Sequence, residues 1–150
     1  VDRKEAKELI DGYFETYPSV KAYMEKSIQI AQEKGYVETI FHRKRFLPDI
    51  NSRNAVVRGY AERNAINAPI QGSAADIIKV AMARIYQRFQ TEGIQAKMIL
   101  QVHDELNFSV PVNEKERVEE IVIEEMEHAY RMHVPLKADC GWGKNWLEAH

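Results

Sequence analysis

Apolar residues recur at helical spacing through the first third of the chain. Between residues 3 and 17 they fall every three or four positions, which predicts a helix with Asp2 as its N-cap. The dipeptide Tyr17-Pro18 interrupts this pattern, and a second apolar stripe then continues to Lys34. Gly35 follows at the position where a glycine commonly ends a helix. We therefore expect a pair of helices at the start of the chain.

The pattern changes to β-prone residues between positions 35 and 48. These residues flank a basic tripeptide, residues 43–45 (Arg-Lys-Arg), so we expect a short hairpin with the tripeptide at its tip. Asn51 or Ser52 is suited to cap the next helix, whose amphipathic pattern runs toward Pro69. Because proline lacks the backbone N–H that a helix interior needs, we expect a break or a kink at that residue.

The clearest helical periodicity in the chain covers residues 71–89, and Gly93 is placed to end this helix. Apolar and polar residues then alternate over residues 94–102 and again over residues 106–110. This alternation predicts a β-hairpin with His103-Asp104-Glu105 at its turn.

The remaining pattern predicts one more helix and one more strand. Residues 113–128 combine an apolar stripe with seven glutamates, which is typical of an amphipathic helix with a solvated acidic face. Residues 134–138 favour a last short strand, which precedes the tripeptide Gly141-Trp142-Gly143. The whole pattern predicts an α+β fold with helices packed on a small antiparallel sheet.

Length and composition are those of one soluble globular unit. The chain has 150 residues, of which 45% are hydrophobic and 29% charged, so it can bury one core without disulfide or metal support. The single cysteine, Cys140, has no partner for an internal disulfide, and we therefore expect a reducing, cytosolic setting. The sequence contains no apolar run of about 18 residues, so we expect no membrane partner.

Charge is segregated along the chain although the net charge is only −2. Residues 43–63 contain six basic and two acidic residues, a net charge of +4, and five of the six basic residues are arginine. Residues 113–128 contain seven acidic and two basic residues, a net charge of −5. The near-neutral total therefore conceals a basic stretch able to face phosphates and an acidic helix that keeps the protein solvated.

The first candidate for chemistry is the expected turn at residues 103–105. Proteins commonly bind Mg²⁺ through one or two carboxylates together with substrate phosphates, and Asp104 with Glu105 offers such ligands. Aspartate is also common in turns because its side chain bonds the local backbone, so a purely structural role for Asp104 stays open. His103 by itself is equally compatible with a packed or solvent-facing imidazole.

The second candidate is the set Arg63, Asn67 and Gln71, which are spaced four apart and which we call the polar row. On a helix these long side chains would align and could meet hydrogen-bond acceptors in the minor groove of DNA. Capping of helix ends by Asn67 and Gln71 is the structural alternative. Arg53 and Arg58 belong to the same basic stretch and are further candidates for contacts with DNA.

In this order the motifs resemble a known family. The row Ala61–Asp76 (AERNAINAPIQGSAAD), followed by Val102-His103-Asp104-Glu105, resembles the C-terminal part of DNA polymerase family A, in particular its bacterial members. The likeness extends to residues 43–50 and 135–137, and so covers essentially the whole chain. It implies a partial polymerase palm with adjoining fingers helices, in which residues 1–50 are fingers-like and residues 51–150 palm-like, in one continuous piece of a larger polymerase domain.

The resemblance also implies roles for individual residues. Asp104 corresponds to a palm aspartate that binds catalytic Mg²⁺, Glu105 to its neighbour at the edge of the metal site, and His103 to a histidine near the primer end. The polar row corresponds to helix positions along the minor groove of the primer-template. The implied activity is template-dependent addition of deoxynucleotides to a primer 3′-end by two-metal phosphoryl transfer, in DNA replication and repair. The implied partners are primer-template DNA and deoxynucleoside triphosphates, and the implied location is the bacterial cytoplasm, in association with the nucleoid.

Two parts of the family's catalytic site have no counterpart in this sequence. They are the second metal-binding aspartate and the fingers helix that binds the phosphates of the incoming nucleotide. We therefore expect the chain to be the end of a longer protein and to begin just after that helix. We also expect the chain alone to be inactive in polymerisation, because Asp104 and Glu105 by themselves cannot hold two Mg²⁺ ions.

Two other functions stay open. The chain could be a non-catalytic nucleic-acid-binding module that uses the basic hairpin. An unrelated metal-dependent hydrolase built on residues 103–105 is less favoured, since such sites usually gather more histidine or carboxylate ligands. Self-association of the chain is a further hypothesis, because a sheet without its partner strand would expose an edge and apolar surface.

Overall fold

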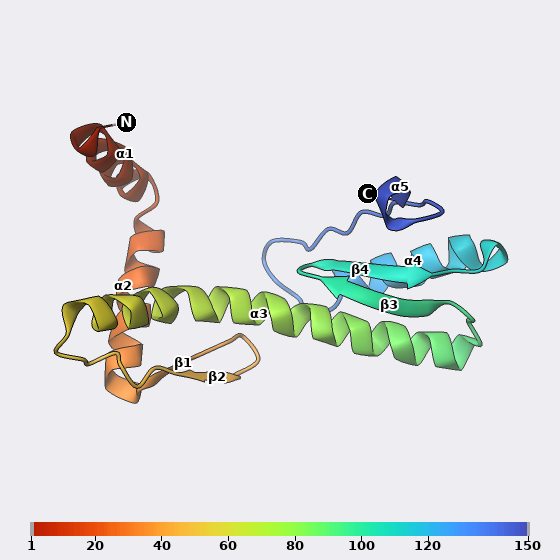
Figure 1. Cartoon of the computed structure of the whole chain (residues 1–150), viewed down its shortest axis with the longest axis horizontal. Coiled ribbons are helices and arrows are strands. Elements are labelled where there is room, and N and C mark those ends of the chain that lie inside the picture. The colour runs from red at the N-terminus through yellow and green to blue at the C-terminus, as the bar shows by residue number, and fades with distance from the viewer. Residues whose placement is uncertain (1, 150) are drawn as a thin grey trace. The chain divides into compact units, whose positions relative to one another are not determined.

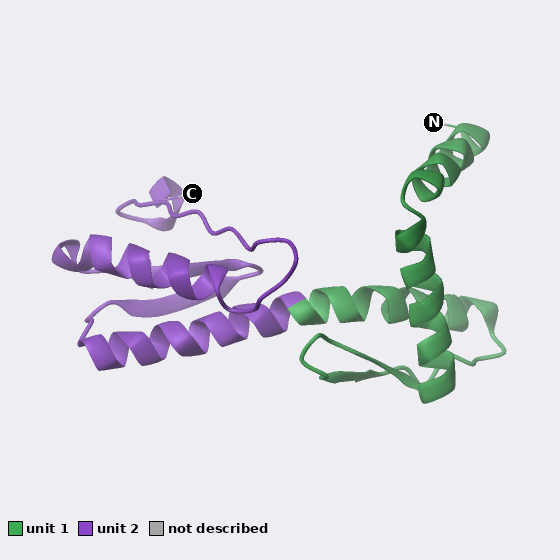
Figure 2. Cartoon of the chain, turned by 180° about the vertical axis from the view of Figure 1, so that it is seen from behind, with its two compact units in different colours: residues 1–73 green, residues 74–150 purple. Residues whose placement is uncertain are grey.

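The computed structural model describes residues 2–149, and the chain divides into two compact units, residues 1–73 and residues 74–150 (Figures 1 and 2). Helix α3 (Ala55–Glu92) starts in unit 1 and continues into unit 2. Each unit contains its own cluster of buried apolar side chains. The candidate functional residues are therefore held by two separate cores.

Unit 1 starts with the two helices that the sequence predicts, α1 (Arg3–Thr16) and α2 (Pro18–Lys34). Asp2 caps α1, and its Oδ1 accepts two backbone N–H groups at 2.8 Å. Gly35 ends α2 in the left-handed conformation, with φ of +76°, and its N–H donates to a carbonyl of the last turn. Both caps and the interruption between the helices are confirmed.

The hairpin of unit 1 consists of β1 (Tyr36–Glu38) and β2 (Lys44–Phe46), which pair in antiparallel orientation. Of the basic tripeptide only Arg43 lies in the loop, so the predicted tip is wrong for Lys44 and Arg45, which belong to β2. Lys44 faces a glutamate of β1 directly across the ladder, and this opposite-charge pair favours extension of the strand.

Helix α3 begins later than the sequence predicts. Asn54 caps it, because its Oδ1 accepts the backbone N–H of Val56 at 3.0 Å, in place of the predicted Asn51 or Ser52. The hydroxyl of Ser52 instead accepts the backbone N–H of Asn54 at 3.2 Å, within the turn that leads into the helix. The cap prediction was therefore wrong by two or three residues.

Of the predicted break or kink at Pro69, the break is wrong, since α3 continues through this residue as one helix of 38 residues, and a kink stays a prediction. Pro69 removes one backbone hydrogen bond from the helix. The helical turns before and after Pro69 are stabilised by tertiary packing, because Ala65 is fully buried and Ser73 nearly so. The hydroxyl of Ser73 also donates to the carbonyl of Pro69. Tertiary packing thus outweighs the local preference of proline.

The core of unit 1 joins α2, the hairpin and the first half of α3. The phenol of Tyr23 on α2 donates to the carbonyl of Ile66 on α3 at 3.1 Å, which fixes the contact between these two helices. The buried apolar residues of this core are Ala31, Val37, Leu47, Ile50, Ala61 and Ala65. Since alanine dominates on α3, the hairpin and α2 can approach the backbone of this helix closely.

Unit 2 contains the second half of α3 and a second hairpin. The hairpin consists of β3 (Lys97–Val102) and β4 (Glu105–Ser109) and is followed by the 3-10 turn η1 (Val112–Glu114), by α4 (Lys115–Glu127) and, after an irregular segment, by α5 (Trp146–Ala149). The predicted hairpin and the predicted acidic helix are confirmed. Two apolar side chains of β3, Ile99 and Leu100, are exposed. Self-association of the chain stays a prediction.

The turn of the second hairpin contains only two residues, His103 and Asp104. Glu105 already pairs with Val102 as the first residue of β4, so the predicted turn is wrong for Glu105. His103 has a left-handed φ of +53°. Two-residue hairpin turns need positive φ because only then does the turn match the twist of the flanking strands.

The core of unit 2 lies between α3, α4 and the second hairpin, whose backbones lie side by side in Figure 2. The rings of Phe89 on α3 and Phe108 on β4 are 5.9 Å apart between their centroids. Ile85 on α3 and Ile121 on α4 are both fully buried. The glutamates of α4 lie on the faces of this helix that the core leaves to solvent and to ion pairs.

The last predicted strand, residues 134–138, is wrong, because this segment forms no strand in the structure. It contains Pro135, which has no backbone N–H to donate to a ladder. The segment is tied to α4 instead: Glu127 Oε1 accepts the backbone N–H of Ala138 at 3.3 Å and the ammonium of Lys137 at 3.4 Å.

The predicted α+β class is confirmed, with the β structure divided into two separate antiparallel hairpins. The compact units divide at residue 73, within α3. The functional division into fingers-like residues 1–50 and palm-like residues 51–150 stays a prediction. None of the helices in the described range 2–149 has the length and apolar character needed to cross a bilayer.

An ion-pair network fastens α3 to α4 in unit 2. The guanidinium of Arg88 contacts Glu124 at 2.6 Å, Glu125 at 3.2 Å and Glu92 at 3.1 Å. Arg117 on α4 contacts Glu92 at 2.6 Å from the other side. Hydrogen bonds from Arg117 and then Arg88 lower the pKa of Glu92, and the hydrogen bond from Arg88 lowers the pKa of Glu124.

This network predicts acid-labile stability. A carboxyl group with a lowered folded-state pKa contributes stability that is present above its ordinary value of 4.5 and is lost as pH falls through the folded-state value. We expect the free energy of unfolding, measured by urea titration at a series of pH values, to decrease below pH 4.5. Arg88→Met should weaken this pH dependence. Lys4→Met, which removes an exposed pair at 4.0 Å, should leave it unchanged. If the free energy of unfolding falls equally with pH in the wild type and in Arg88→Met, the ion pairs of Arg88 do not cause the pH dependence.

Candidate functional site

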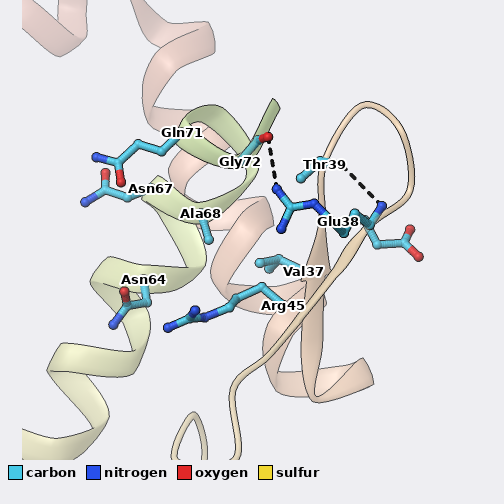
Figure 3. A pocket seen from close by; sticks show the side chains of 10 residues that line it. Val37, Glu38, Thr39, Arg45, Asn64, Asn67, Ala68, Gln71 and Gly72 are labelled. Atoms are coloured by element: carbon cyan, nitrogen blue, oxygen red, sulfur yellow. Dashed lines mark hydrogen bonds between the residues drawn. The ribbon is translucent and has the colours of Figure 1, made fainter. Parts of the chain in front are cut away.

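The candidate nucleic-acid surface of unit 1 is a groove of about 290 Å³ between α3 and the hairpin, which we call the basic groove (Figure 3). One wall carries amide side chains of α3, and the other carries Arg43 and Arg45 of the hairpin. Glu38 is its one acidic lining residue, so the groove has a positive balance. The lining residues are Val37, Glu38, Thr39, Arg43, Arg45, Asn64, Asn67, Ala68, Gln71 and Gly72.

The groove exists because the hairpin loop docks directly on the backbone of α3. A Cβ atom placed on Gly72 would lie 2.7 Å from Thr39 Cγ2 and 3.3 Å from Arg43 Nη2, so only glycine permits this approach. Arg43 Nη2 donates to the carbonyl of Gly72 at 3.2 Å, which is one of the dashed lines in Figure 3. Ser73 Oγ accepts the backbone N–H of Ile40 at 2.9 Å.

The polar row lies on one helix, and all three of its side chains are exposed. Asn67 and Gln71 are among the residues that line the basic groove. They lie one turn apart on α3, and in Figure 3 their side chains extend from the helix on the side away from Arg45. The guanidinium carbon of Arg63 lies 5.9 Å from the ring centroid of Tyr60, which places it over an aromatic face. The structure thus aligns the row as its spacing predicts, and the alternative of helix-end capping is wrong, because the residues lie in the helix interior.

Of the ten residues that line the groove, the sequence analysis singled out only Asn67 and Gln71, and two of the polar residues that it missed are Asn64 and Arg45. Asn64 lies next to the polar row rather than on its four-residue spacing, and its amide donates to the carbonyl of Tyr60 at 3.0 Å. Arg45 reaches the groove from β2, and in Figure 3 its side chain extends toward Asn64. The net charge of the basic stretch indicated such a role for its arginines in general. No local pattern distinguished Arg45 from its neighbours.

The other predicted DNA-binding residues, Arg53 and Arg58, differ in their contacts. Arg58 Nη1 donates to the carbonyl of Ser52 at 2.9 Å, and its Nε lies 3.7 Å from Glu62, so this side chain supports the start of α3. Arg53 is exposed and makes no hydrogen bond or ion pair with any residue in the described range. Arg53 is therefore the better placed of the two for contact with a phosphate.

The candidate catalytic residues lie at the tip of the second hairpin, in unit 2. His103 and Asp104 are exposed, and the carboxylate of Asp104 makes no hydrogen bond or ion pair within residues 2–149. The carbonyl of His103 accepts the amide of Gln101 at 3.1 Å, which supports the turn. An aspartate that formed the turn through its own side chain would accept a hydrogen bond from the local backbone. Since the carboxylate of Asp104 accepts none within the described range, it is available to a ligand.

Glu105 differs from Asp104 because its carboxylate is engaged. Its Oε1 accepts the amide of Asn107 and the indole N–H of Trp146, both at 2.8 Å. Asp104 and Glu105 line one end of a cavity of about 560 Å³ that β4 forms with α4 and residues 137–149. The contact with Trp146 was not predicted, since 41 residues separate the two partners in sequence.

The donor set at this tip fits part of a Mg²⁺ site. Asp104 offers an exposed carboxylate, which is the oxygen ligand that Mg²⁺ prefers. Glu105 offers a carboxylate already fixed by two N–H donors. No three His, Cys, Asp or Glu side chains within the described residues are grouped so that they could hold a metal ion. A Mg²⁺ ion at Asp104 would thus take its other ligands from outside this set, as Mg²⁺ commonly does from waters and phosphates.

Comparisons with known proteins cover the parts of the chain that form the basic groove and the tip of the second hairpin. The family model "DNA polymerase family A" matches residues 1–148. The chain is 54% identical over 149 residues to DNA polymerase I of Bacillus caldotenax and 52% identical to that of Streptococcus pneumoniae, covering 99% of this chain in each case. The chain spans 17% of the length of these relatives.

A solved structure is also similar, the POL domain of Pol1 from M. smegmatis in complex with DNA primer-template and dNTP. The TM-score is 0.97 at 43% sequence identity, and the match covers 99% of this chain and 26% of that chain. The similarity therefore extends over both units and includes the second hairpin and α3.

The docking of the hairpin on Gly72 can be tested by two matched glycine substitutions in α3. Gly72→Ala should lower the free energy of unfolding by about 1 kcal/mol, because the new methyl group meets a buried threonine whose hydroxyl is held by two backbone N–H groups. Gly59→Ala should raise it by up to about 1 kcal/mol, since the nearest atom is 3.8 Å away and alanine favours the helix. Urea titration measures both, and an equal gain for the two variants would refute the close approach.

Proposed function

The chain belongs to DNA polymerase family A, and on that premise we propose that it supplies the hairpin aspartate and part of the DNA surface of a template-dependent DNA polymerase. The reaction would be the addition of deoxynucleotides to a primer 3′-end, in DNA replication and repair. Because the chain spans 17% of its relatives, the remaining parts of the site would come from the rest of a polymerase domain. These include the second metal-binding carboxylate and the groups that hold the incoming nucleotide.

The observation that carries this proposal is the state of Asp104. Its carboxylate is exposed, lies on a two-residue turn, and has no hydrogen-bond or ion-pair partner within residues 2–149. A purely structural role would require the carboxylate to be buried or hydrogen-bonded. Within the described part of the chain, the carboxylate of Asp104 is neither. A short hairpin between two paired strands holds such a carboxylate at a fixed position, which is what positioning of a phosphoryl-transfer centre requires.

Asp104, with Glu105 beside it, would supply part of the ligand set for the two Mg²⁺ ions of the complete site, whose chemistry would be activation of the primer 3′-hydroxyl and stabilisation of the leaving pyrophosphate. The part of this chain in that chemistry is to hold the carboxylates still. The exposed imidazole of His103 precedes Asp104 in the turn, and we assign it to contact with the primer end. Glu105 stands at the edge of the metal site rather than at its centre, because one of its oxygens is already committed.

The basic groove and the polar row would contact the primer-template duplex. Arginine suits phosphate oxygens, while asparagine and glutamine can donate to adenine N3 or thymine O2 in the minor groove. Those acceptors are shared by A·T and T·A pairs, so contacts by Asn67 and Gln71 would hold DNA without choosing its sequence. Family membership and bacterial relatives support a location in the bacterial cytoplasm, at the nucleoid.

Asp104→Asn provides the direct test. In the longer polymerase that contains this chain, we expect nucleotide addition to fall by at least about 1,000-fold, because one carboxylate ligand becomes a neutral amide. Affinity for primer-template DNA should change by less than about threefold, since the DNA surface is intact. Asp11→Asn, an exposed aspartate on α1, is the control and should retain full activity. Full activity of Asp104→Asn would favour the non-catalytic binding module.

The 150-residue chain alone should not extend a primer, because its carboxylates supply only part of a two-metal site. Primer extension with Mg²⁺ and all four deoxynucleotides is the measurement. The same preparation, checked for folding by circular dichroism, removes misfolding as an explanation. Template-dependent extension well above the background of an Asp104→Asn chain would refute this expectation.

Arg63→Ala tests the polar row. In the longer polymerase we expect weaker binding of every duplex sequence. We also expect the slope of log Kd against the logarithm of the salt concentration to become smaller by about one, as for loss of one phosphate contact. Lys79→Ala, an exposed lysine on the same helix, is the matched control and should change neither quantity. Equal effects of the two substitutions would argue against a specific role for Arg63.

A further inference from the structure

Residues 141–149 join α4 to the tip of the second hairpin through two tryptophans. Trp142 Nε1 donates to Glu119 Oε2 on α4 at 2.7 Å, and Lys115 Nζ lies 4.8 Å from the centroid of the Trp142 ring. Trp146 Nε1 donates to Glu105 Oε1 on β4 at 2.8 Å. The two indoles are therefore held by different carboxylates in the same unit.

The backbone of this segment is folded tightly enough to fix where Trp146 lies. A Cβ atom on Gly141 would overlap the carbonyl oxygen of Ala149, and one on Gly143 would come within 2.6 Å of the Ala149 nitrogen. The side chain of Asn145 accepts the backbone N–H of Glu148 at 3.1 Å and so starts α5. The pair of glycines around Trp142 thus allows α5 to fold back against the segment that precedes it.

One oxygen of Glu105 receives N–H donors from two directions, from Asn107 on its own strand and from Trp146 on α5. Two donors on one carboxylate oxygen restrict the rotation of the side chain, and groups beside a metal site commonly orient its ligands in this way. Only one of the two donors is local in sequence. The other comes from α5, which is 41 residues away in sequence.

We propose that Trp146 is a positioning residue that orients the carboxylate of Glu105 beside Asp104, and that the Gly141-Trp142-Gly143 segment serves to hold Trp146 in place. The proposal rests on the proposed function in that Glu105 is taken to act at the edge of the metal site. The hydrogen bond between Trp146 and Glu105, and the restriction that it places on the Glu105 side chain, do not depend on that function. They can therefore be tested separately.

The first experiment is a ¹⁵N NMR spectrum of the chain, which contains only two indole N–H groups. Trp146→Phe assigns the signals by removing one. Glu105→Ala should move the Trp146 signal toward the position of a solvent-exposed indole and leave the Trp142 signal in place, because Trp142 is bonded to Glu119. A Trp146 signal that does not respond to Glu105→Ala would overturn the proposal.

The second experiment is kinetic, in the longer polymerase that contains this chain. Trp146→Phe should lower kcat about 10-fold and raise the Mg²⁺ concentration needed for half-maximal rate, with KM for the nucleotide changed less than twofold, as for loss of an outer partner of a metal ligand. Tyr86→Phe is the control, since Tyr86 is an exposed aromatic residue of the same unit outside this segment and its side chain makes no hydrogen bond within residues 2–149, and its kcat should stay within twofold of wild type.

A double variant separates positioning from a general structural effect. Trp146→Phe should have no further effect on kcat in a Glu105→Ala background, because the carboxylate that it orients is already absent. Additive losses would overturn the proposal. If Asp104→Asn retains activity, the proposed function fails. If Asp104→Asn is inactive while Trp146→Phe is fully active, only the role of Trp146 fails.

Discussion

A proline inside a helix gives up one backbone hydrogen bond and crowds the preceding turn, and the surface of unit 1 depends on α3 remaining continuous through Pro69. Side chains spaced four apart share a face only while the helical repeat is unbroken. Arg63 and Asn67 precede the proline and Gln71 follows it, so a break would separate the last from the others. Gly72 and the hairpin loop that docks on it also lie on the far side of Pro69.

Most elements fixed by neighbouring residues could be predicted from the sequence, although the cap of α3 at Asn54 was missed, and elements fixed by distant contacts could not. The caps at Asp2 and Gly35 act within one helical turn, and both were predicted. The predicted break at Pro69 was wrong because burial on either side of it outweighs its local cost. The predicted strand at residues 134–138 was wrong because a strand needs a partner edge, while this segment bonds to a side chain of α4.

The same distinction applies to the candidate site. The spacing of the polar row and the two-strand pattern around Asp104 placed these residues correctly, since helix and strand periodicity are properties of the local chain. Arg45 reaches the basic groove only because the hairpin docks on α3. The guanidinium of Arg58 donates to a backbone carbonyl at the start of α3, a contact that the sequence did not indicate, while its contact with DNA stays a prediction. Charge alone does not distinguish an arginine that supports a helix from one that faces a ligand.

Both tryptophans of the chain lie in unit 2, and each donates its indole N–H to a carboxylate of that unit. Fluorescence excited selectively in tryptophan therefore reports on unit 2 alone, whereas the helical circular dichroism signal reports on both units. Because multi-unit chains need not unfold in a single transition, the two probes together can resolve the order in which the units unfold without any added label. The chain thus carries its own optical reporter for one half of its fold.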